Sequence, residues 1–363
     1  MISIVIPTFN EVGNIIPLIE NLIEIINNFE YEIIIVDDDS PDGTSEKINK
    51  YMKRNERIKL ITRIGRSGLS SAIKEGLLFA RYNFVLVLDG DGQHDPSCIL
   101  NMIENIQDGK TDLVIASRFL NSSKLEGLSI NRNYGSKISN KVARFSLPNE
   151  YLNITDYLSG CFCLNKKTTE FLIRKVQING FKFLYEILSL SKGKLLIKEV
   201  PLRFKKREYG NSKLDVAIIW DFIISILHNI SLRILPRRAI SFGLVGFTGI
   251  FVQLFITQFL TTVFLIDFYR ALPLAVICAA TSNFLINNQL TFRSKRLRNF
   301  SLFIGLLKFL LVASLPIMAN VGITTAFVKY ISADTFIAQL AGIAIVYAWN
   351  YLASSLFVWN QSI

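Results

Sequence analysis

Two carboxylates, Asp89 and Asp91, follow directly after an apolar run at residues 84–88. A short apolar run bounded by turn-forming residues predicts a buried strand. The carboxyl end of that strand would place both side chains in a crevice, where open α/β sheets bind ligands. Two such carboxylates repel each other unless a cation joins them, and Mg²⁺ or Mn²⁺ suits oxygen ligands and nucleotide phosphates. An acidic turn without a ligand is the alternative, because an Asp-x-Asp motif alone is common.

Polar residues also follow two other predicted strands, with Asn10 and Glu11 after residues 2–7 and Asp37 to Asp39 after residues 32–36. The remaining apolar periodicity predicts further strands at 58–61 and 112–117, and helices at 15–27, 44–51, 70–80 and 97–107. This alternation predicts a mostly parallel sheet with helices on both faces, so the three polar clusters would converge on one edge. The sequence contains no Gly-x-Gly-x-x-Gly motif and no Walker-type lysine loop. A nucleotide would therefore be held by metal and carboxylates.

Motifs spread over the first ~215 residues resemble, in order, those of the polyprenyl-phosphate glycosyltransferases of family 2, in particular the dolichol-phosphate mannosyltransferases. The matching segments are residues 7–11, 36–44 and 89–96, Ser117-Arg118, Ser159-Gly160, and Arg207-x-x-Gly210-x-Ser212-Lys213-Leu214. The resemblance implies a GT-A fold, a Rossmann-like, mostly parallel α/β sheet that forms the catalytic domain.

The resemblance also implies roles for individual residues. The nucleotide sugar would be bound by Pro7, Phe9, Glu11, Asp37, Asp39, Asp89, Asp91 and Gln93. The metal, Mg²⁺ or Mn²⁺, would be ligated by Asp89, Asp91 and Gln93. The acceptor phosphate would be bound by Arg118, Arg132, Ser136, Arg207 and Lys213, and the residues most directly involved in catalysis would be Asp91, Arg118 and Arg207.

The reaction implied by the resemblance needs little acid–base catalysis. A lipid monophosphate acceptor is already anionic at neutral pH, so its attack on the sugar requires no strong general base. This suits a chain whose only histidines are His94 and His228. A single displacement would invert the anomeric centre. The remaining task is to hold two anionic reactants together, which arginine does best through bidentate phosphate contacts.

Residues 128–147 predict an amphipathic helix. Its apolar positions include Ile138, Val142 and Phe145, and Lys141 and Arg144 lie on a neighbouring stripe. An apolar face beside a basic face indicates a helix at a membrane surface. An ordinary helix packed on the sheet explains the pattern equally well.

Residues 214–235 predict a more apolar helix with a polar stripe, formed by Asp221, Ser225, His228 and Asn229. A membrane-spanning helix would bury this stripe in lipid at a cost of a few kcal/mol. We therefore expect an interfacial amphipathic helix that leaves the stripe in water.

The remainder of the chain has the pattern of a membrane domain. Four spans fit, at about 240–266, 271–292, 303–328 and 336–359. The loop between the second and third spans carries Arg293, Lys295, Arg296 and Arg298, so the positive-inside rule predicts that it and both termini are cytoplasmic. No cleavable signal peptide is recognised. The expected organisation is a catalytic domain at 1–213, an interfacial helix at 214–235 and a four-helix transmembrane domain at 236–363 in the cell membrane.

The net charge of +11 is explained better by anionic lipid than by nucleic acid, because no nucleic-acid-binding motif is present. The four cysteines, Cys98, Cys161, Cys163 and Cys278, have no metal-site spacing. We expect all four to be reduced and structural, with Cys161 and Cys163 on one face of a strand.

The two halves of the membrane region resemble each other at an offset of 67 residues. The aliphatic matches are weak, and more weight falls on Asn283 with Asn350 and Asp267 with Asp334. Such an offset predicts a parallel repeat of two helical hairpins. The region also resembles the GtrA-like membrane domains, through Asn283-Phe284-x-x-Asn287 and Phe242-x-Leu244-Val245-Gly246. The resemblance implies anchoring or flipping of a lipid-linked sugar, and the scarcity of charges in the spans favours anchoring.

The function expected from the sequence is metal-dependent, inverting transfer of a hexose, mannose from GDP-mannose, to a polyprenyl phosphate such as dolichyl phosphate. A UDP-glucose:undecaprenyl-phosphate glucosyltransferase is the alternative within this class. A lipid-linked sugar flippase with a vestigial transferase domain is the alternative from another class, which intact Asp89, Asp91 and Arg207 disfavour. The Gln-x-x-Arg-Trp motif of processive polysaccharide synthases is absent from the sequence.

Overall fold

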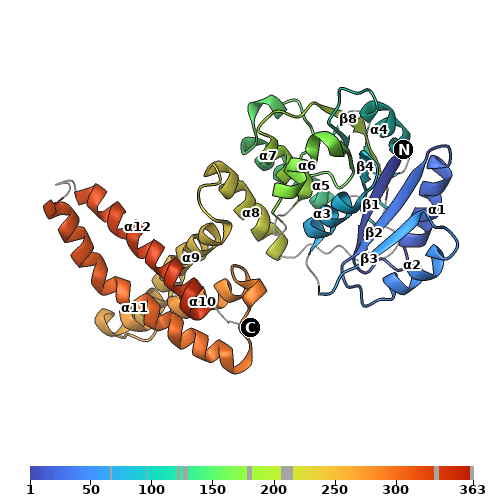
Figure 1. Cartoon of the computed structure of the whole chain (residues 1–363). Helices are drawn as coiled ribbons and strands as arrows, with labels where there is room; N and C mark the ends of the chain where they lie inside the picture. Colours follow the sequence, from blue (N-terminus) through green and yellow to red (C-terminus); the bar gives the residue numbers. More distant parts are fainter. Residues whose placement is uncertain are drawn as a thin grey trace. The chain divides into compact units, whose positions relative to one another are not determined.

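A computed structural model describes residues 1–65, 68–95, 97–120, 123–125, 130–177, 182–205, 216–330 and 335–359. Side-chain surroundings are described for these residues except 124–125, 130–134, 216, 315–330, 335–341 and 343. The chain forms two compact units, Met1–Ile230 and Ser231–Ile363 (Figure 1). The boundary between them falls within the segment predicted to be an interfacial helix.

The first unit contains a seven-stranded sheet in the order β3-β2-β1-β4-β7-β5-β8. Its strands are β1 (Ile2–Thr8), β2 (Tyr31–Asp37), β3 (Ile58–Thr62), β4 (Phe84–Val87), β5 (Leu113–Ser117), β7 (Phe162–Asn165) and β8 (Ile197–Pro201). Strand β7 pairs antiparallel with β4 and β5, and the other pairs are parallel. A second, two-stranded sheet pairs β6 (Lys124–Leu125) with β9 (Arg203–Phe204). The predicted mostly parallel α/β fold is confirmed.

Helices cover both faces of the large sheet (Figure 1). One face packs against α1 (Ile15–Ile26), α2 (Thr44–Met52) and α4 (Cys98–Ile106). The opposite face packs against α3 (Leu69–Phe79), α5 (Ile130–Phe145), α6 (Lys166–Lys175), α7 (Phe183–Ser191) and α8 (Val216–Ile230). Strands β1, β2 and β5 are buried at every residue because both sides of the sheet meet helices, whereas the edge strands β3 and β8 are partly exposed.

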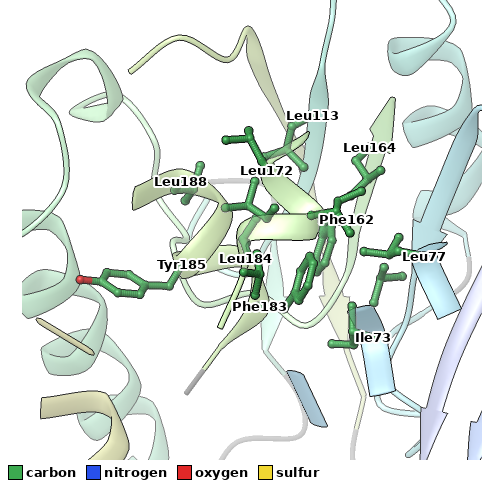
Figure 2. Close-up of a cluster of buried hydrophobic side chains, with 14 of the residues drawn as sticks. Ile73, Leu77, Leu113, Phe162, Leu164, Leu172, Phe183, Leu184, Tyr185 and Leu188 are labelled. Carbon is green, nitrogen blue, oxygen red and sulfur yellow. The ribbon is translucent and has the colours of Figure 1, made fainter. Parts of the chain in front are cut away.

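Strand alternation divides the core into two clusters. In β1, Ile4 and Ile6 contribute to one cluster and Val5 to the other, as the two-residue period of a strand requires. Phe162 of β7 stacks on Phe183 of α7 with ring centroids 6.1 Å apart (Figure 2). Cys161 and Cys163 are both fully buried in the other cluster, with Ile4 and Ile6, so the prediction that both sulfurs lie on one face is confirmed.

Helix α5 exposes its apolar stripe. Ile138, Val142 and Phe145 are exposed, together with the neighbouring Lys141 and Arg144. The helix is fixed from its other side, where the Asn140 amide donates to the backbone of Thr155 and Ala143 is buried. The alternative in which this apolar stripe packs on the sheet is therefore excluded for these three residues.

The polar stripe of helix α8 does not face water as predicted. Ser225 and His228 are buried, so the prediction that the polar stripe faces water is wrong. Asn229 donates to the backbone carbonyl of Ser146 and accepts a hydrogen bond from Ser189 Oγ at 2.5 Å. The stripe turns inward because the ends of α5 and α7 offer it polar partners. The exposed side of α8 is apolar instead and includes Ile219, Ile223 and Ile230.

The second unit is helical. Its helices are α9 (Arg237–Thr262), α10 (Phe268–Gln289), α11 (Asn299–Tyr330) and α12 (Thr335–Ala353), and a π-helical turn follows at Ser354–Val358. Among the described residues, α9 and α10 are by themselves long and apolar enough to cross a membrane. Helices α11 and α12 coincide in position with the other two predicted spans, whose crossing stays a prediction.

The buried side chains of Asn288 and Trp359 fix the basic loop between α10 and α11. Asn288 accepts a hydrogen bond from the Leu297 backbone at 2.8 Å and from Trp359 Nε1 at 3.1 Å. The Trp359 ring stacks on Phe292 with centroids 4.1 Å apart. Arg293, Lys295, Arg296 and Arg298 remain exposed around this buried anchor.

Candidate active site

Strands β1, β2 and β4 are neighbours in the sheet, so the polar clusters that follow them lie at one edge. Thr8 and Asp37, the last residues of β1 and β2, are register partners. The Leu88 backbone donates to Val5 of β1 at 3.1 Å, which continues the β4 pairing to the residue before Asp89. The predicted convergence of the three strand ends is therefore seen in the sheet order.

Asp89 lies against the chain that leads into β7. A Cβ atom at position 160 would lie 2.0 Å from Asp89 Oδ2, so only glycine fits beside this carboxylate. This close approach explains why Ser159-Gly160 accompanies Asp89 in the motif set. Asp91 accepts a hydrogen bond from the Gln93 backbone at 3.1 Å, which fixes the turn. Asp89 and Asp91 are both half-buried and thus open to a ligand.

The segment after Asp91 is tied to β9. Gln93 is buried, and its Nε2 donates to the Lys205 carbonyl at 3.2 Å. His94 packs edge-on against Phe204 with centroids 5.5 Å apart, and its Nδ1 has no hydrogen-bond partner among the described residues. Burial lowers the pKa of His94 against the opposing effect of Asp89 and Asp91. The carboxylate loop is thus held by the chain that immediately precedes residues 206–215.

Asp37 is saturated with hydrogen bonds from its own chain. Its carboxylate accepts from Thr8 Oγ1 at 2.8 Å, Ser40 Oγ at 2.6 Å, Ser40 N at 3.0 Å and Ser45 Oγ at 2.8 Å. Each oxygen therefore accepts two bonds, and Asp37 fixes the loop between β2 and α2. Its predicted contact with the nucleotide stays a prediction.

The other predicted nucleotide-binding residues surround this loop. Glu11 is buried and accepts from Asn14 Nδ2 at 2.7 Å. Asp39 is exposed, adopts a positive φ of 62°, and accepts from the Gly65 backbone at 3.1 Å. Pro7 is buried in β1 and Phe9 is half-buried. All of them lie at the end of the sheet that carries Asp89.

Arg63 was not singled out from the sequence as a site residue. Its Nη1 donates to buried Asp38 at 3.0 Å, and its Nη2 donates to Ser71 Oγ at 2.5 Å. Asp38 also accepts from the Gly68 backbone at 2.8 Å. Arg63 thereby links the β2 and β3 loops to the start of α3. Asp38 belongs to the acidic cluster seen in the sequence, but nothing in the sequence indicated that Arg63 is its partner.

Arg118 forms a bidentate ion pair that the sequence did not predict. Its Nε and Nη2 donate to the Asp156 carboxylate at 2.7 and 2.8 Å, and Asp156 is fully buried. Glu199 of β8 accepts from the backbone nitrogens of Thr155 and Asp156 at 2.9 and 3.0 Å. Burial raises the pKa of Glu199. Arg118 is therefore positioned by buried Asp156, whose backbone is held by half-buried Glu199. An Asp three residues before Ser159-Gly160 was the only available signal.

The predicted acceptor-phosphate residues are only partly covered by the structure. Arg118 is described, and Ser136 is half-buried on α5. Arg207 and Lys213 lie outside the described residues, as does the side chain of Arg132. Arg118 Nη1 makes no hydrogen bond to any residue of the described ranges, which leaves it available to an anion.

The described residues contain no group of three or more His, Cys, Asp or Glu side chains that could enclose a metal by themselves. Asp89 and Asp91 still supply two half-buried carboxylates at a strand end. Hard cations bound to nucleotides commonly take one or two carboxylates and complete their shell with phosphate oxygens and water. The donor set therefore fits a divalent ion that is shared with a diphosphate.

Comparison with known protein families and sequences identifies a matching family for each unit. The profile of "Glycosyl transferase family 2" matches residues 3–170, and that of "GtrA/DPMS, transmembrane domain" matches residues 241–359. A curated dolichol-phosphate mannosyltransferase of Pyrococcus furiosus is 32% identical over 360 residues, 99% of each chain. The dolichol-phosphate mannosyltransferase of Saccharomyces cerevisiae is 29% identical over 61% of this chain and 84% of its own.

Solved structures resemble the first unit only distantly. A glucosyl-3-phosphoglycerate synthase of Mycobacterium tuberculosis has 18% identity and a TM-score of 0.46, over 63% of this chain and 79% of its own. A mannosyl-3-phosphoglycerate synthase of Rubrobacter xylanophilus has 14% identity and a TM-score of 0.46, over 64% and 73%. These structural similarities are too distant to identify the family, but the full-length sequence match identifies it. The chain belongs to the dolichol-phosphate mannosyltransferase family, glycosyltransferases of family 2 that are joined here to a GtrA/DPMS transmembrane domain.

Proposed function

We propose that this protein transfers mannose from GDP-mannose to a polyprenyl phosphate, by metal-dependent displacement that inverts the anomeric centre. The observation that carries the proposal is the match to the Pyrococcus furiosus dolichol-phosphate mannosyltransferase over 99% of both chains. The match extends over both units and therefore includes the membrane domain as well as the predicted catalytic domain.

Asp89 and Asp91 form the donor end of the site in this proposal. They would hold a divalent cation, which when bound supplies positive charge to the departing nucleoside diphosphate. Gly160 sets the position of the Asp89 carboxylate, and the Gln93 backbone sets that of Asp91. Because both carboxylates are fixed before the nucleotide arrives, little reorganisation is needed at the moment of reaction.

Arg118 forms the acceptor end. Its fork is held by Asp156 through Nε and Nη2, so Nη1 would offer a fixed donor to the lipid phosphate. The acceptor oxygen attacks the sugar as an anion, and no described residue has to remove a proton from it. Arg207, Lys213, Arg132 and Ser136 are proposed to complete this phosphate site.

The apolar side chains on α5 and α8 are proposed to bring this site to the bilayer. Phe145 and Ile138 of α5, and Ile219 and Ile223 of α8, are all exposed on the catalytic unit. Apolar helix faces flanked by lysine and arginine bind membrane surfaces. With the exposed basic loop after α10 in the cytoplasm, the catalytic domain and both termini would be cytoplasmic.

The test is transfer by the purified full chain in liposomes with Mg²⁺ or Mn²⁺. Labelled GDP-mannose and UDP-glucose are each offered with dolichyl phosphate and with undecaprenyl phosphate. We expect a lipid-linked mannose product, loss of transfer in EDTA, and a loss of several orders of magnitude for Asp91→Asn. Asp108→Asn, which alters an exposed carboxylate paired with Lys198, is the control and should transfer normally.

Transfer of glucose in place of mannose would refute the proposed donor. Undiminished transfer in EDTA, or by Asp91→Asn, would refute the metal-dependent mechanism. A product with retained anomeric configuration would refute the single displacement.

A further inference from the structure

Asn140 of α5 is hydrogen-bonded to the segment that holds Arg118, and the proposed reaction gives it no role. Its Nδ2 donates to the Thr155 carbonyl, and its Oδ1 accepts from the Tyr157 backbone at 2.8 Å. The residue between these two contacts is Asp156, whose carboxylate holds Arg118 through Nε and Nη2. One carboxamide is therefore bonded to the chain on both sides of the carboxylate that positions the proposed phosphate-binding arginine.

The segment around Asp156 is also bonded to the sheet. Glu199 of β8 accepts from the backbone nitrogens of Thr155 and Asp156 at 2.9 and 3.0 Å. The Thr155 hydroxyl lies 2.5 Å from that of Ser117, the last residue of β5. These contacts already hold the ion pair of Arg118 and Asp156 against the sheet. The contacts from α5 therefore add something different, which is the position of α5 itself relative to that ion pair.

The position of α5 matters because the helix carries other residues of the proposed acceptor site. Ser136, one turn before Asn140, is half-buried, and Arg132 follows the same spacing one turn earlier in the sequence. Helical residues four apart share a face. Among the described side chains of α5, at 135–145, Asn140 alone hydrogen-bonds to a described residue of another element. A shift of α5 would thus carry its polar face away from Arg118.

The requirement on this spacing is strict. The terminal oxygens of one phosphate belong to a single small group, so donors from two elements can bind it together only if their separation is set within about 0.5 Å. The face of α5 that carries Ile138, Val142 and Phe145 is exposed and is proposed to meet the bilayer. The same helix therefore carries the membrane contact on one face and the link to Arg118 on another.

We propose that Asn140 is a positioning residue for the acceptor phosphate. It ties α5 to the segment 155–157, so that Arg118 and the polar face of α5 can bind the same phosphate group. The inference rests on the acceptor site of the proposed function, and it adds a residue that touches neither substrate. A purely structural carboxamide would affect the stability of the chain and all ligands alike, whereas a positioning residue affects the lipid phosphate selectively.

The test measures the binding of two ligands separately on the full chain in detergent. The probes are labelled farnesyl phosphate, a soluble polyprenyl phosphate, and GDP with Mg²⁺, with UDP in parallel. Asn140→Ala should lower the affinity for farnesyl phosphate about fivefold and leave nucleotide affinity unchanged. Asn105→Ala is the matched control, because its amide bonds only within its own helix, and it should change neither affinity. Farnesol reports binding of the lipid tail alone and should bind equally to all variants.

A double-mutant cycle with Arg118→Gln tests whether Asn140 acts together with Arg118. In the Arg118→Gln background, Asn140→Ala should cost about twofold or less in farnesyl phosphate affinity, because the alignment no longer matters. An equal loss in both backgrounds would overturn the inference, and so would an equal loss of nucleotide affinity. Melting temperatures establish which variants are folded. Asn140→Asp, which keeps the acceptor for the Tyr157 backbone but loses the donor to Thr155, decides if the alanine variant is not folded.

Binding and transfer together separate this inference from the proposed function. A native chain that binds farnesyl phosphate with the expected loss in Asn140→Ala, but transfers no mannose, would refute only the proposed function. A native chain that transfers mannose, with farnesyl phosphate affinity unchanged in folded Asn140→Ala, would refute only the inference. Unchanged affinity in folded Arg118→Gln would refute the acceptor role of Arg118 and, with it, the role of Asn140.

Discussion

The strand ends of the first unit and the helices of the second treat their buried polar groups in opposite ways. At the strand ends, carboxylates are held by the chain: Asp37 accepts four hydrogen bonds and Asp156 holds Arg118 at two atoms. Between the helices of the second unit, Asn283 and Asn350 keep buried oxygens that have no hydrogen-bond partner among the described residues. The held carboxylates suit a site for charged ligands, which must fix its charges in advance.

We expect the largest effect when one of the held carboxylates, Asp89, is displaced by a substitution at a neighbouring residue. Gly160→Ala should reduce transfer at least tenfold, because its Cβ would lie 2.0 Å from Asp89 Oδ2 and must displace it. Initial rates of lipid-linked sugar formation measure the effect. Gly135→Ala, in α5 with no atom within 4 Å of the new Cβ, is the control and should transfer normally. A native rate in Gly160→Ala would mean that the position of Asp89 is not critical.

Removing the partner of Arg118 tests how strongly the first site is held. Asp156→Asn leaves a buried guanidinium without its counter-charge, which costs about 3–5 kcal/mol. At roughly 2–4 °C per kcal/mol for a unit of this size, the melting temperature should fall by about 10 °C. Glu170→Gln breaks an exposed pair with Arg174 and should change it by ~1 °C or less. Equal shifts in the two variants would show that the Arg118 pair is no more than a surface contact.

Within the membrane unit, two asparagines make a matched pair. Asn288→Leu should destabilise by about 1–3 kcal/mol, because it leaves the Leu297 backbone and Trp359 Nε1 without their partner. Asn350→Leu should cost nothing or stabilise, because its oxygen has no partner among the described residues to lose. Thermal unfolding of the full chain in detergent compares them. A larger loss in Asn350→Leu would show that its amide is already satisfied.

The smallest expected effect is a pH dependence of the first unit. Burial raises the pKa of Glu32, but bonds from Lys59, Ser3 and the Arg81 backbone outweigh this and lower it below 4.5. A lowered folded pKa contributes stability that is present above the unfolded pKa and is lost as pH falls through the folded value. Glu32→Gln should therefore cost about 1–2 kcal/mol at pH 7, and this difference should shrink below pH 4.5. Melting temperatures of both proteins from pH 7 to pH 3 measure it, and a constant difference would contradict the assignment.

The strands were predictable because each apolar run is followed by polar and turn-forming residues. Predicted strands at 2–7 and 32–36 became Ile2–Thr8 and Tyr31–Asp37. The insertion of antiparallel β7 between β4 and β5 was not predictable, because a strand of four residues fits several places in a sheet. Local patterns determine that a strand forms, whereas tertiary packing determines which strand it joins.

The site was predictable where one segment carries the chemistry, as Asp89 and Asp91 do. It was not predictable where partners are distant in sequence, as Asp38 with Arg63 or Arg118 with Asp156. The polar stripe of α8 was misjudged for the same reason, since its partners Ser146 and Ser189 lie 83 and 40 residues away from Asn229.

The stacking of Trp359 on Phe292 has a consequence for biosynthesis. The loop between α10 and α11 reaches its final packing only when Asn288 and Phe292 meet a side chain that is made about 70 residues later. At ~5–20 residues per second, the first hairpin waits several seconds in the bilayer before that side chain exists. We expect the hairpin to insert early and the loop to become resistant to proteases only after Trp359 has emerged from the ribosome, so that membrane insertion and final folding of this unit are separate events.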